Sequence, residues 1–307
     1  MIDFTLSEEQ EALRDLVRDF ATREIAPLAP TLDEEQRHSP EIVEKYFEIG
    51  FLHYAAPEEY GGAGLGTLEG CLFNEELGAA CGGVTCMLGG NTLGLTPLFI
   101  AGSEDLKGEI LPEHTSGPNL AAFCLTEAGA GSDAGAMRST AHLEGGEYVI
   151  NGTKTFITNG GVAKVFSVFA MEDAESGTRG ISAFMVPTNL PGITIGKKEN
   201  KMGQRAADTR EVTFENVRIP ARFRLGEGMD GFKIAMMTLD ESRATVGAAA
   251  VGIARAALDA ATEYAKERVQ FGRPIAGHQA IQFTLADMAT KVNAGRLLCW
   301  HAAWLKD

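Results

Sequence analysis

The segment from Gly231 to Gln270 constrains the fold of this chain more than any other feature, because it contains no proline and is rich in alanine. Its central part, GAAAVGIARAALDAATEYAKER, has high helix propensity. A continuous helix of about 40 residues would be about 60 Å long. Such a helix cannot bury its apolar stripe by itself, so the segment predicts that other helices pack against it.

A second helical pattern follows the loop FGRPIAG at 271–277 and supplies one such partner. Its apolar residues recur at helical spacing, at Ile281, Leu285, Met288 and Val292. Two long antiparallel helices make half of a four-helix bundle. The sequence therefore predicts a C-terminal helical bundle that is present only in part, with apolar surface exposed on Ile281 and Leu285.

The first 118 residues also have helical patterns. Ser7 with Gln10 predicts a capping box. Ser39 and Ser103 each precede a helical pattern and predict two further helix starts. Residues 77–103 carry no charge and are long enough to span a bilayer, but their many helix-breaking residues favour a buried helix–loop–helix without a membrane span.

The middle of the chain, residues 119–225, contains short β-rich runs. Gly145–Gly146 predicts a two-residue hairpin between two of them, and Asn151–Gly152 predicts a turn. Several short strands at this spacing predict a compact antiparallel barrel or sandwich. The predicted fold is therefore α+β and mainly α. A helical domain at 1–118 precedes a β-domain at 119–225 and an incomplete helical domain at 226–307.

Charge and cysteine content exclude several classes of function. The chain has 27 Lys and Arg against 42 Asp and Glu, a net charge of −15. This argues against a nucleic-acid binder, although one or two local cations could still hold a phosphorylated small molecule. The five cysteines and six histidines show no metal-ligand spacing, so we predict no metal site. The first residues show no secretory signal pattern, and we expect a cytoplasmic protein.

The glycines at 226–231 match the G-x-G-x-x-G pattern of nicotinamide-binding Rossmann sites. However, Glu227 and Asp230 would repel a pyrophosphate, and Pro220 separates the motif from the preceding strand. No second parallel strand is predicted after the helix. We interpret this segment as a flexible loop that leads into the long helix.

Two other segments carry the features of a ligand site. In 121–133, AAFCLTEAGAGSD, a β-run leads into a loop whose glycines and hydroxyls offer free backbone N–H groups to carbonyls or phosphates. In 154–160, Phe156 and Thr158 lie two apart and so on one face of a strand. An aromatic ring with a nearby hydroxyl suits a flat heterocycle. The alternatives are an ordinary turn and a strand end with one core phenylalanine.

Arginines near both ends of the long helix are candidate phosphate ligands. Arg243 can bind a phosphate in a bidentate manner, or it can pair with Asp240 three residues earlier. Arg268 and Arg273 flank Phe271 and could hold a pyrophosphate. They could equally interact with the C-terminal end of the helix.

Two motifs resemble those of the acyl-CoA dehydrogenase family of flavoenzymes. CLTEAGAGSD at 124–133 is similar to the family signature Leu-Thr-Glu-x-x-Ala-Gly-Ser-Asp. QFGRPIAGHQAIQFTLADMA at 270–289 resembles its Gln-Phe-Gly-x-x-[Ile/Leu]-x-x-x-Gln-x-[Ile/Val] signature. The resemblance runs the whole length of the chain. It implies FAD as cofactor, α,β-dehydrogenation of a fatty acyl-CoA to a trans-2-enoyl-CoA, an electron-transfer flavoprotein as partner, and a homo-oligomer, commonly a tetramer.

The resemblance also implies the roles of particular residues. Those lining the flavin and its diphosphate would be Phe123, Leu125, Thr126, Gly131, Ser132, Phe156 and Thr158. Those reaching the FAD of a neighbouring subunit would be Arg268, Phe271, His278 and Gln279. Those contacting the substrate would be Ser132, Asp240 and Arg243. The family often has tryptophan at the position of Phe156, so the stacking area is smaller here.

The catalytic base is where the sequence departs from the family. Most branches have a glutamate in a Tyr-Glu-Gly-Thr-like segment, which this sequence lacks, so we expect that glutamate to lie beyond Asp307. A few branches place the base at the position of Ser242, and serine cannot act as a base at neutral pH. Glu241 is turned from that position by about 100° around the helix. The sequence therefore predicts a C-terminally truncated, inactive member with no catalytic residue. A non-catalytic acyl-CoA- and FAD-binding relative and an acyl-CoA oxidase are the alternatives.

Overall fold

The computed structural model describes residues 4–228 and 230–307. The first three residues of the expected N-terminal domain and Met229 of the expected 226–231 loop lie outside the described residues. By its internal contacts the chain forms two compact units. The helical unit comprises residues 1–30, 66–85 and 243–307, and the sheet unit comprises residues 31–65 and 86–242. The boundaries of the three expected domains stay a prediction.

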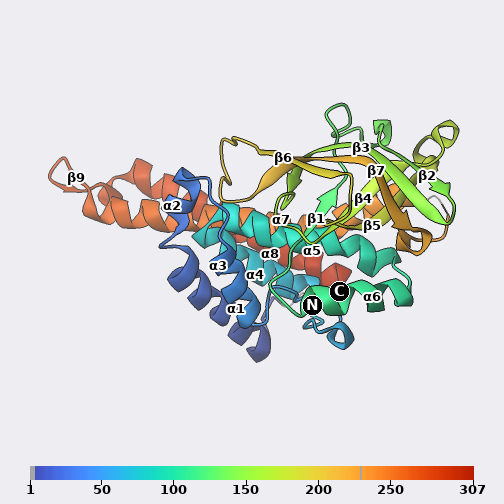
Figure 1. The fold of residues 1–307 in the computed structure, drawn as a ribbon. Coiled ribbons are helices and arrows are strands. Elements are labelled where there is room, and N and C mark those ends of the chain that lie inside the picture. The colour runs from blue at the N-terminus through green and yellow to red at the C-terminus, as the bar shows by residue number, and fades with distance from the viewer. Residues whose placement is uncertain (1–3, 229) are drawn as a thin grey trace. The chain divides into compact units, whose positions relative to one another are not determined.

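Long helices form most of the helical unit, namely α1 (Glu8–Phe20), α4 (Thr67–Ala80), the greater part of α7 (Gly231–Glu267) and α8 (Gln279–Lys306). The long helix predicted from Gly231 is confirmed and ends at Glu267. A short hairpin of β9 (Val269–Gln270) and β10 (Arg273–Pro274) joins α7 to α8 at one end of both (Figure 1). The hairpin replaces the loop expected there, because Phe271 and Gly272 both take positive φ, as a tight two-residue turn requires.

The predicted helix starts are confirmed in both units. Ser7 and Gln10 form the reciprocal capping box of α1. Ser39 caps α3 (Pro40–Glu48), with Pro40 in its first turn, and Ser103 caps α6 (Glu104–Thr115). In each case the serine hydroxyl accepts a backbone N–H that has no partner inside the helix.

The backbones of α4 and α7 touch at two glycines. A methyl group on Gly252 would lie 2.0 Å from the carbonyl oxygen of Glu75. One on Gly78 would lie 2.4 Å from the carbonyl oxygen of Ala249. Beside this contact, a small core formed by Cys71, Ala248 and Ala303 is fully buried. The sequence therefore uses glycine here because no larger residue fits between the two helices.

Asp307 closes the N-terminal end of α4. Its Oδ1 accepts the backbone N–H of Thr67 and its Oδ2 that of Leu68, both at 2.9 Å. Partial burial would raise the pKa of this carboxyl, but the two N–H donors hold the pKa below its ordinary value. The negative charge also lies at the positive end of the helix dipole.

Asp307→Ala is expected to lower the free energy of unfolding by about 1–2 kcal/mol at pH 7, the usual cost of removing a capping carboxylate. Because the folded pKa lies below the unfolded value of about 3.9, this stabilisation is present above about pH 4 and is lost as the pH falls through the folded pKa. Urea unfolding of both proteins at pH 7 and pH 3 measures the difference. An equal difference at both pH values would contradict this assignment.

The sheet unit is organised around one mixed sheet (Figure 1). Its strands run in the order β6–β7–β3–β2–β4–β5–β8, and β1 also pairs with β4. Their bounds are β1 Ala121–Cys124, β2 Thr140–Glu144, β3 Glu147–Thr158, β4 Val165–Met171, β5 Ile181–Pro187, β6 Ile193–Lys198, β7 Thr209–Pro220 and β8 Arg224–Leu225. Most pairs are antiparallel as predicted, but β1 and β2 each pair with β4 in parallel.

One turn prediction in the sheet is confirmed and one is wrong. Gly145 and Gly146 join β2 to β3 with φ of 62° and 87°, as predicted for a hairpin. Asn151–Gly152 lies inside β3 at a register shift and does not form a turn. Gly152 is needed there because a Cβ would lie 2.3 Å from the hydroxyl oxygen of Ser139. The glycine therefore marks a bulge and close packing.

The expected helix–loop–helix at 77–103 is also wrong, because α5 (Gly82–Ala101) is continuous and only Cys81 separates it from α4. Gly94 allows a close approach and does not break the helix. A Cβ on Gly94 would lie 2.6 Å from the backbone nitrogen of Ala122. Pro97 is tolerated inside the helix.

The exposed apolar surface of α8 is not where the sequence predicted it. Ile281 and Leu285 are half-buried. Instead, Phe283, Leu298 and Trp304 are each more than 60% exposed. The spacing predicted the helix correctly, but it did not indicate which face of α8 the other helices of the unit cover.

Two helices, α5 and α7, are long and apolar enough to cross a membrane by length and composition. Core helices of soluble proteins pass the same test, and half of the apolar stretch of α5 is buried inside the protein. This finding gives little support to a membrane location.

Candidate functional site

The first candidate segment leaves the sheet at the end of β1. Phe123 is half-buried, and its ring centroid lies 5.0 Å from that of Phe169 on the neighbouring strand β4. Leu125 is buried, and Thr126 is half-buried. After Thr126 the chain forms the exposed loop that the glycine pattern predicted.

The glycine loop is open to a ligand. Gly131 and Ser132 are both exposed. A Cβ on Gly129 or Gly131 would meet no atom of the described residues within 4 Å. The loop therefore offers backbone N–H groups and a hydroxyl with no bulky side chain in the way, which suits a negatively charged group such as a diphosphate.

The second candidate segment, the end of β3, lies directly beside the first. The backbone N–H of Thr155 donates to the carbonyl oxygen of Thr126 at 2.9 Å. The Lys154 ammonium donates to the carbonyl oxygen of Leu125 at 3.2 Å. The structure therefore brings together the two segments that the sequence singled out separately.

Phe156 has the most unusual geometry of the candidate residues in the sheet unit. It lies at a register shift between β3 and β7, has a φ of 58°, and is 64% exposed. The alternation expected for a regular strand is interrupted there, because Lys154 and Thr155 are both buried. A positive φ is costly for an aromatic residue and recurs at ligand sites. The effect here is to present the ring to solvent, while Thr158 two residues on is half-buried.

A buried ion pair fixes these two segments, and the sequence reasoning gave it no role. The ammonium of Lys154, which is fully buried, lies 2.7 Å from Oε1 of Glu127. The Glu127 carboxylate also accepts the backbone N–H of Arg138 at 2.6 Å and both the backbone N–H and the hydroxyl of Ser139. Glu127 belongs to the glycine loop and Lys154 to β3, so the pair joins them.

The pKa values of the pair follow from burial and mutual attraction. Burial would raise the pKa of Glu127, but the hydrogen bonds from Lys154 and Ser139 hold it below its ordinary value. Burial lowers the pKa of Lys154, and Glu127 opposes that change. The glutamate is therefore ionised at neutral pH and acts as the hydrogen-bond acceptor that organises the loop.

Asn159 lies in the second candidate segment and is a further residue to which the sequence assigned no role. Its amide nitrogen donates to the carbonyl oxygens of Met87 on α5 and Ala121 on β1. A Cβ on Gly90 would lie 3.0 Å from both Thr158 and Asn159, so α5 packs closely against the end of β3. Asn159 also has a positive φ of 64°. The Asn159–Gly160 pair directly after the strand was the sequence signal that could have identified this residue.

The remaining candidate residues lie on α7 and around the β9–β10 hairpin. Asp240 and Arg243 are exposed and three residues apart on α7, so they lie on one side of the helix. Around the hairpin, Phe271 is 96% exposed, and its ring lies 5.8 Å from that of His278. Arg268 and Gln279 are exposed on either side of the hairpin. Arg243 and the hairpin residues belong to the helical unit, whereas the glycine loop, Phe156 and Asp240 belong to the sheet unit.

Ser242 and Glu241, the residues considered for a catalytic base, are adjacent on α7. The hydroxyl of Ser242 donates to the carbonyl oxygen of Leu239 at 2.9 Å, and Glu241 is half-buried. Within residues 4–228 and 230–307, no three His, Cys, Asp or Glu side chains are grouped so that they could hold a metal ion.

Comparison with known protein families covers nearly the whole chain. Residues 7–118 match "Acyl-CoA dehydrogenase, N-terminal domain", residues 122–217 match "Acyl-CoA dehydrogenase, middle domain", and residues 229–307 match "Acyl-CoA dehydrogenase, C-terminal domain". The matched segments fall inside the three domains expected from the sequence.

Individual relatives agree with these matches. The chain is 44% identical over 303 residues to an acyl-CoA dehydrogenase of Bacillus subtilis, covering 98% of this chain and 80% of that protein. It is similar to a solved structure of butyryl-CoA dehydrogenase from Megasphaera elsdenii, with a TM-score of 0.96 and 40% identity over 99% of this chain and 81% of that one. A structure described as the electron transferring flavoprotein of Acidaminococcus fermentans also matches, with a TM-score of 0.96 and 44% identity over 99% and 80% of the two chains.

Both signature motifs, the glycine loop beside β3 and the order of helical and sheet segments agree with these matches over almost the full length of the chain. The chain belongs to the acyl-CoA dehydrogenase family of oxidoreductases.

Proposed function

We propose that this chain binds FAD and a fatty acyl-CoA for α,β-dehydrogenation to a trans-2-enoyl-CoA, with electrons passed on to an electron-transfer flavoprotein. The observation that carries the proposal is the junction of the glycine loop with β3. There an exposed aromatic ring, a hydroxyl and open backbone N–H groups are held together by the buried pair Lys154–Glu127. Family membership supplies the reaction class.

The residues present fit a flavin dinucleotide. The exposed ring of Phe156 provides a flat apolar surface for an isoalloxazine ring. The unobstructed backbone at Gly131 and the hydroxyl of Ser132 can approach a diphosphate. Phe123, Leu125 and Thr126 would form the wall behind the ring. When bound, FAD supplies the acceptor for a hydride leaving the substrate β-carbon. Arg268, Phe271, His278 and Gln279 would contact the FAD of a second subunit.

Phe156→Ala is expected to weaken FAD binding about tenfold, because an aromatic contact of this kind contributes about 1–1.5 kcal/mol beyond its buried area. Titration of the apoprotein with FAD, followed by flavin absorbance and fluorescence, measures the dissociation constant. Leu143→Ala on β2 is a matched control, since Leu143 is 58% exposed, similar to Phe156. Equal FAD affinity of the Phe156 variant and the control would contradict the assignment.

The substrate would be held at its CoA end by Ser132, Asp240 and Arg243. A guanidinium can grip a phosphate with two parallel hydrogen bonds, and Asp240 and Arg243 are suitably spaced on one side of α7. Removal of the substrate α-proton requires a carboxylate, and the Ser242 hydroxyl cannot take that role at neutral pH.

We propose that residues 1–307 bind both ligands, and that Ser242→Glu raises their acyl-CoA-dependent dye reduction. General base catalysis typically contributes about 10²–10⁴-fold, and an increase of at least tenfold is expected from a base that is not optimally placed. Ser242→Gln, which has the same size but no charge, is the control. Full dehydrogenase activity of the parent chain would contradict the proposal.

The same assay distinguishes the alternatives. A protein that takes up FAD and acyl-CoA without bleaching of the flavin, even as the Ser242→Glu variant, is a non-catalytic binding relative. Reduction that produces hydrogen peroxide in air identifies an acyl-CoA oxidase. We further propose that the protein is cytoplasmic and forms a homotetramer. Light scattering with the FAD-loaded protein would test the oligomeric state.

A further inference from the structure

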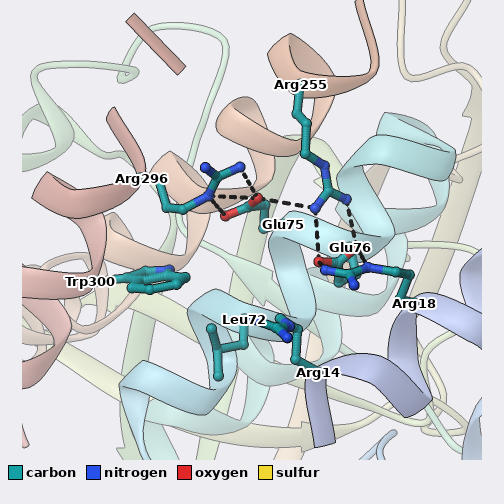
Figure 2. Close-up of a pocket in the computed structure, with 8 residues that line it drawn as sticks. All are labelled: Arg14, Arg18, Leu72, Glu75, Glu76, Arg255, Arg296 and Trp300. Atoms are coloured by element: carbon teal, nitrogen blue, oxygen red, sulfur yellow. Dashed lines mark hydrogen bonds and ion pairs between the residues drawn. The ribbon is translucent and has the colours of Figure 1, made fainter. Parts of the chain in front are cut away.

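A polar cavity in the helical unit has no role in the proposed function. Its volume is about 290 Å³, and its walls come from α1, α4, α7 and α8 (Figure 2). Two glutamates, Glu75 and Glu76, project from α4 into the centre of a group of arginines. Because every lining residue belongs to the helical unit, the cavity is defined by that unit alone.

Three arginines neutralise the two glutamates. Glu76 accepts from Arg18 at 2.9 Å and from Arg255 at 2.5 Å, and Glu75 accepts from Arg296 at 2.8 Å and from Arg255 at 3.3 Å. Both glutamates are only 3% exposed. Burial would raise the pKa of Glu76, but the hydrogen bonds from Arg255 and Arg18 hold it below its ordinary value. Three guanidinium groups therefore bond to the two buried carboxylates, and Arg18 also bonds to the exposed Asp15 at 3.2 Å.

A fourth arginine adds a further positive charge without a buried partner. Arg14 lines the cavity and is 23% exposed. Its Nε and Nη2 bond to Asp15, the next residue in the sequence, whose carboxylate is 58% exposed and also bonds to Arg18. Within residues 4–228 and 230–307, Nη1 of Arg14 has no hydrogen-bond partner. Because the Asp15 carboxylate is exposed, its attraction to Arg14 is weak. Much of the electrostatic field of Arg14 therefore remains available to attract an anion.

The opposite wall provides an unused donor. The indole Nε1 of Trp300 is buried, and no acceptor lies within hydrogen-bond distance among the described residues. A buried N–H without an acceptor is costly and is rare in folded proteins. Trp300 and Leu72 also supply the apolar part of the lining. The cavity therefore combines a group of four guanidinium groups, one free guanidinium nitrogen, an unpaired N–H and an apolar surface.

We propose that this cavity binds a small organic oxyanion, a carboxylate or phosphate carried on a skeleton of a few carbons. Arg14 and the Trp300 indole N–H hold the anionic group, and Leu72 with the indole ring contacts the skeleton. The volume lies just below the range of about 300–1,000 Å³ typical of ligand pockets, which favours a small ligand. Local charge decides the ligand class, because a net charge of −15 on the chain would otherwise repel anions.

Calorimetric titration with sodium phosphate and with sodium succinate, at ionic strength matched with sodium chloride, tests the proposal. We expect one site per chain for at least one probe. Arg14→Gln should weaken it about tenfold or more, because a charged hydrogen bond is lost. Trp300→Phe should weaken binding less. Tighter phosphate binding identifies a phosphorylated ligand, and tighter succinate binding identifies a carboxylate.

Two matched variants separate this site from others. Arg23→Gln removes an arginine from the turn that follows α1, where it pairs with Asp19, and should leave binding unchanged. Arg243→Gln alters the residue proposed to hold CoA and should also leave binding of the probes to the cavity unchanged. Failure of the proposed CoA site can therefore be distinguished from failure of the cavity site. The proposal is overturned if neither probe binds, if Arg14→Gln binds like Arg23→Gln, or if Arg243→Gln abolishes binding.

Discussion

Glu127→Gln is expected to lower the free energy of unfolding by about 3–5 kcal/mol and to abolish stable flavin binding. The variant leaves the fully buried ammonium of Lys154 without a counter-charge, and breaking one partner of a buried pair typically costs this much. The loop loses its ionised acceptor for Arg138 and Ser139 at the same time. Urea unfolding and FAD titration measure the two effects.

A matched exposed pair is available as control. Lys266 and Glu263 lie 2.6 Å apart on the surface of α7, almost the same separation as Lys154 and Glu127. Glu263→Gln should cost at most about 1 kcal/mol, because solvent screens an exposed pair. Glu127→Leu combined with Lys154→Met removes both buried charges and should recover part of the stability but not the FAD affinity. Similar losses in Glu127→Gln and Glu263→Gln would show that burial is not decisive.

Gly252→Ala is expected to have the second large effect, a loss of about 2–3 kcal/mol in the free energy of unfolding. Its methyl group would lie 2.0 Å from the carbonyl oxygen of Glu75, so α7 must move away from α4. Intrinsic helix propensity favours alanine over glycine by about 1 kcal/mol, so the two effects have opposite signs. Thermal and urea unfolding measure the net change in the free energy of unfolding and show which effect is larger.

Gly108→Ala isolates the propensity effect. Gly108 lies in α6, is exposed, and no described atom would come within 4 Å of an added Cβ. This variant should be more stable than the parent by about 0.5–1 kcal/mol. If Gly252→Ala also stabilised the protein, the close contact between α4 and α7 would be refuted.

Features decided within a few residues of sequence were predictable. Ser7, Ser39 and Ser103 cap helices because the hydroxyl and its N–H partner are three residues apart. Gly145–Gly146 forms a hairpin for a similarly local reason. Gly94, one of the helix-breaking residues counted in 77–103, does not break its helix, and Gly152 does not form a turn. Their true role depends on Ala122 and Ser139, which contact them from other elements.

The parts of the candidate site that depend on local sequence were also predictable. The glycine loop and the Phe156 segment were identified from their composition, and the family motifs added residue roles. The pair that joins them was not found, because Glu127 and Lys154 are 27 residues apart and a charged residue is by default expected at the surface. The positive φ of Phe156 likewise depends on a register shift between β3 and β7 that the local sequence does not encode.

The buried glutamates of α4 have a consequence for the order of folding. Arg255 reaches Glu75 across 180 residues of sequence, and Arg296 reaches it across 221. During synthesis α4 emerges long before both of these arginines, while the strands of the sheet unit follow it in one continuous run. The sheet unit can therefore fold first. Until α7 and α8 are present, Glu75 lacks these arginine partners, and its burial would be costly. The long sequence separation of these contacts predicts that the helical unit assembles late.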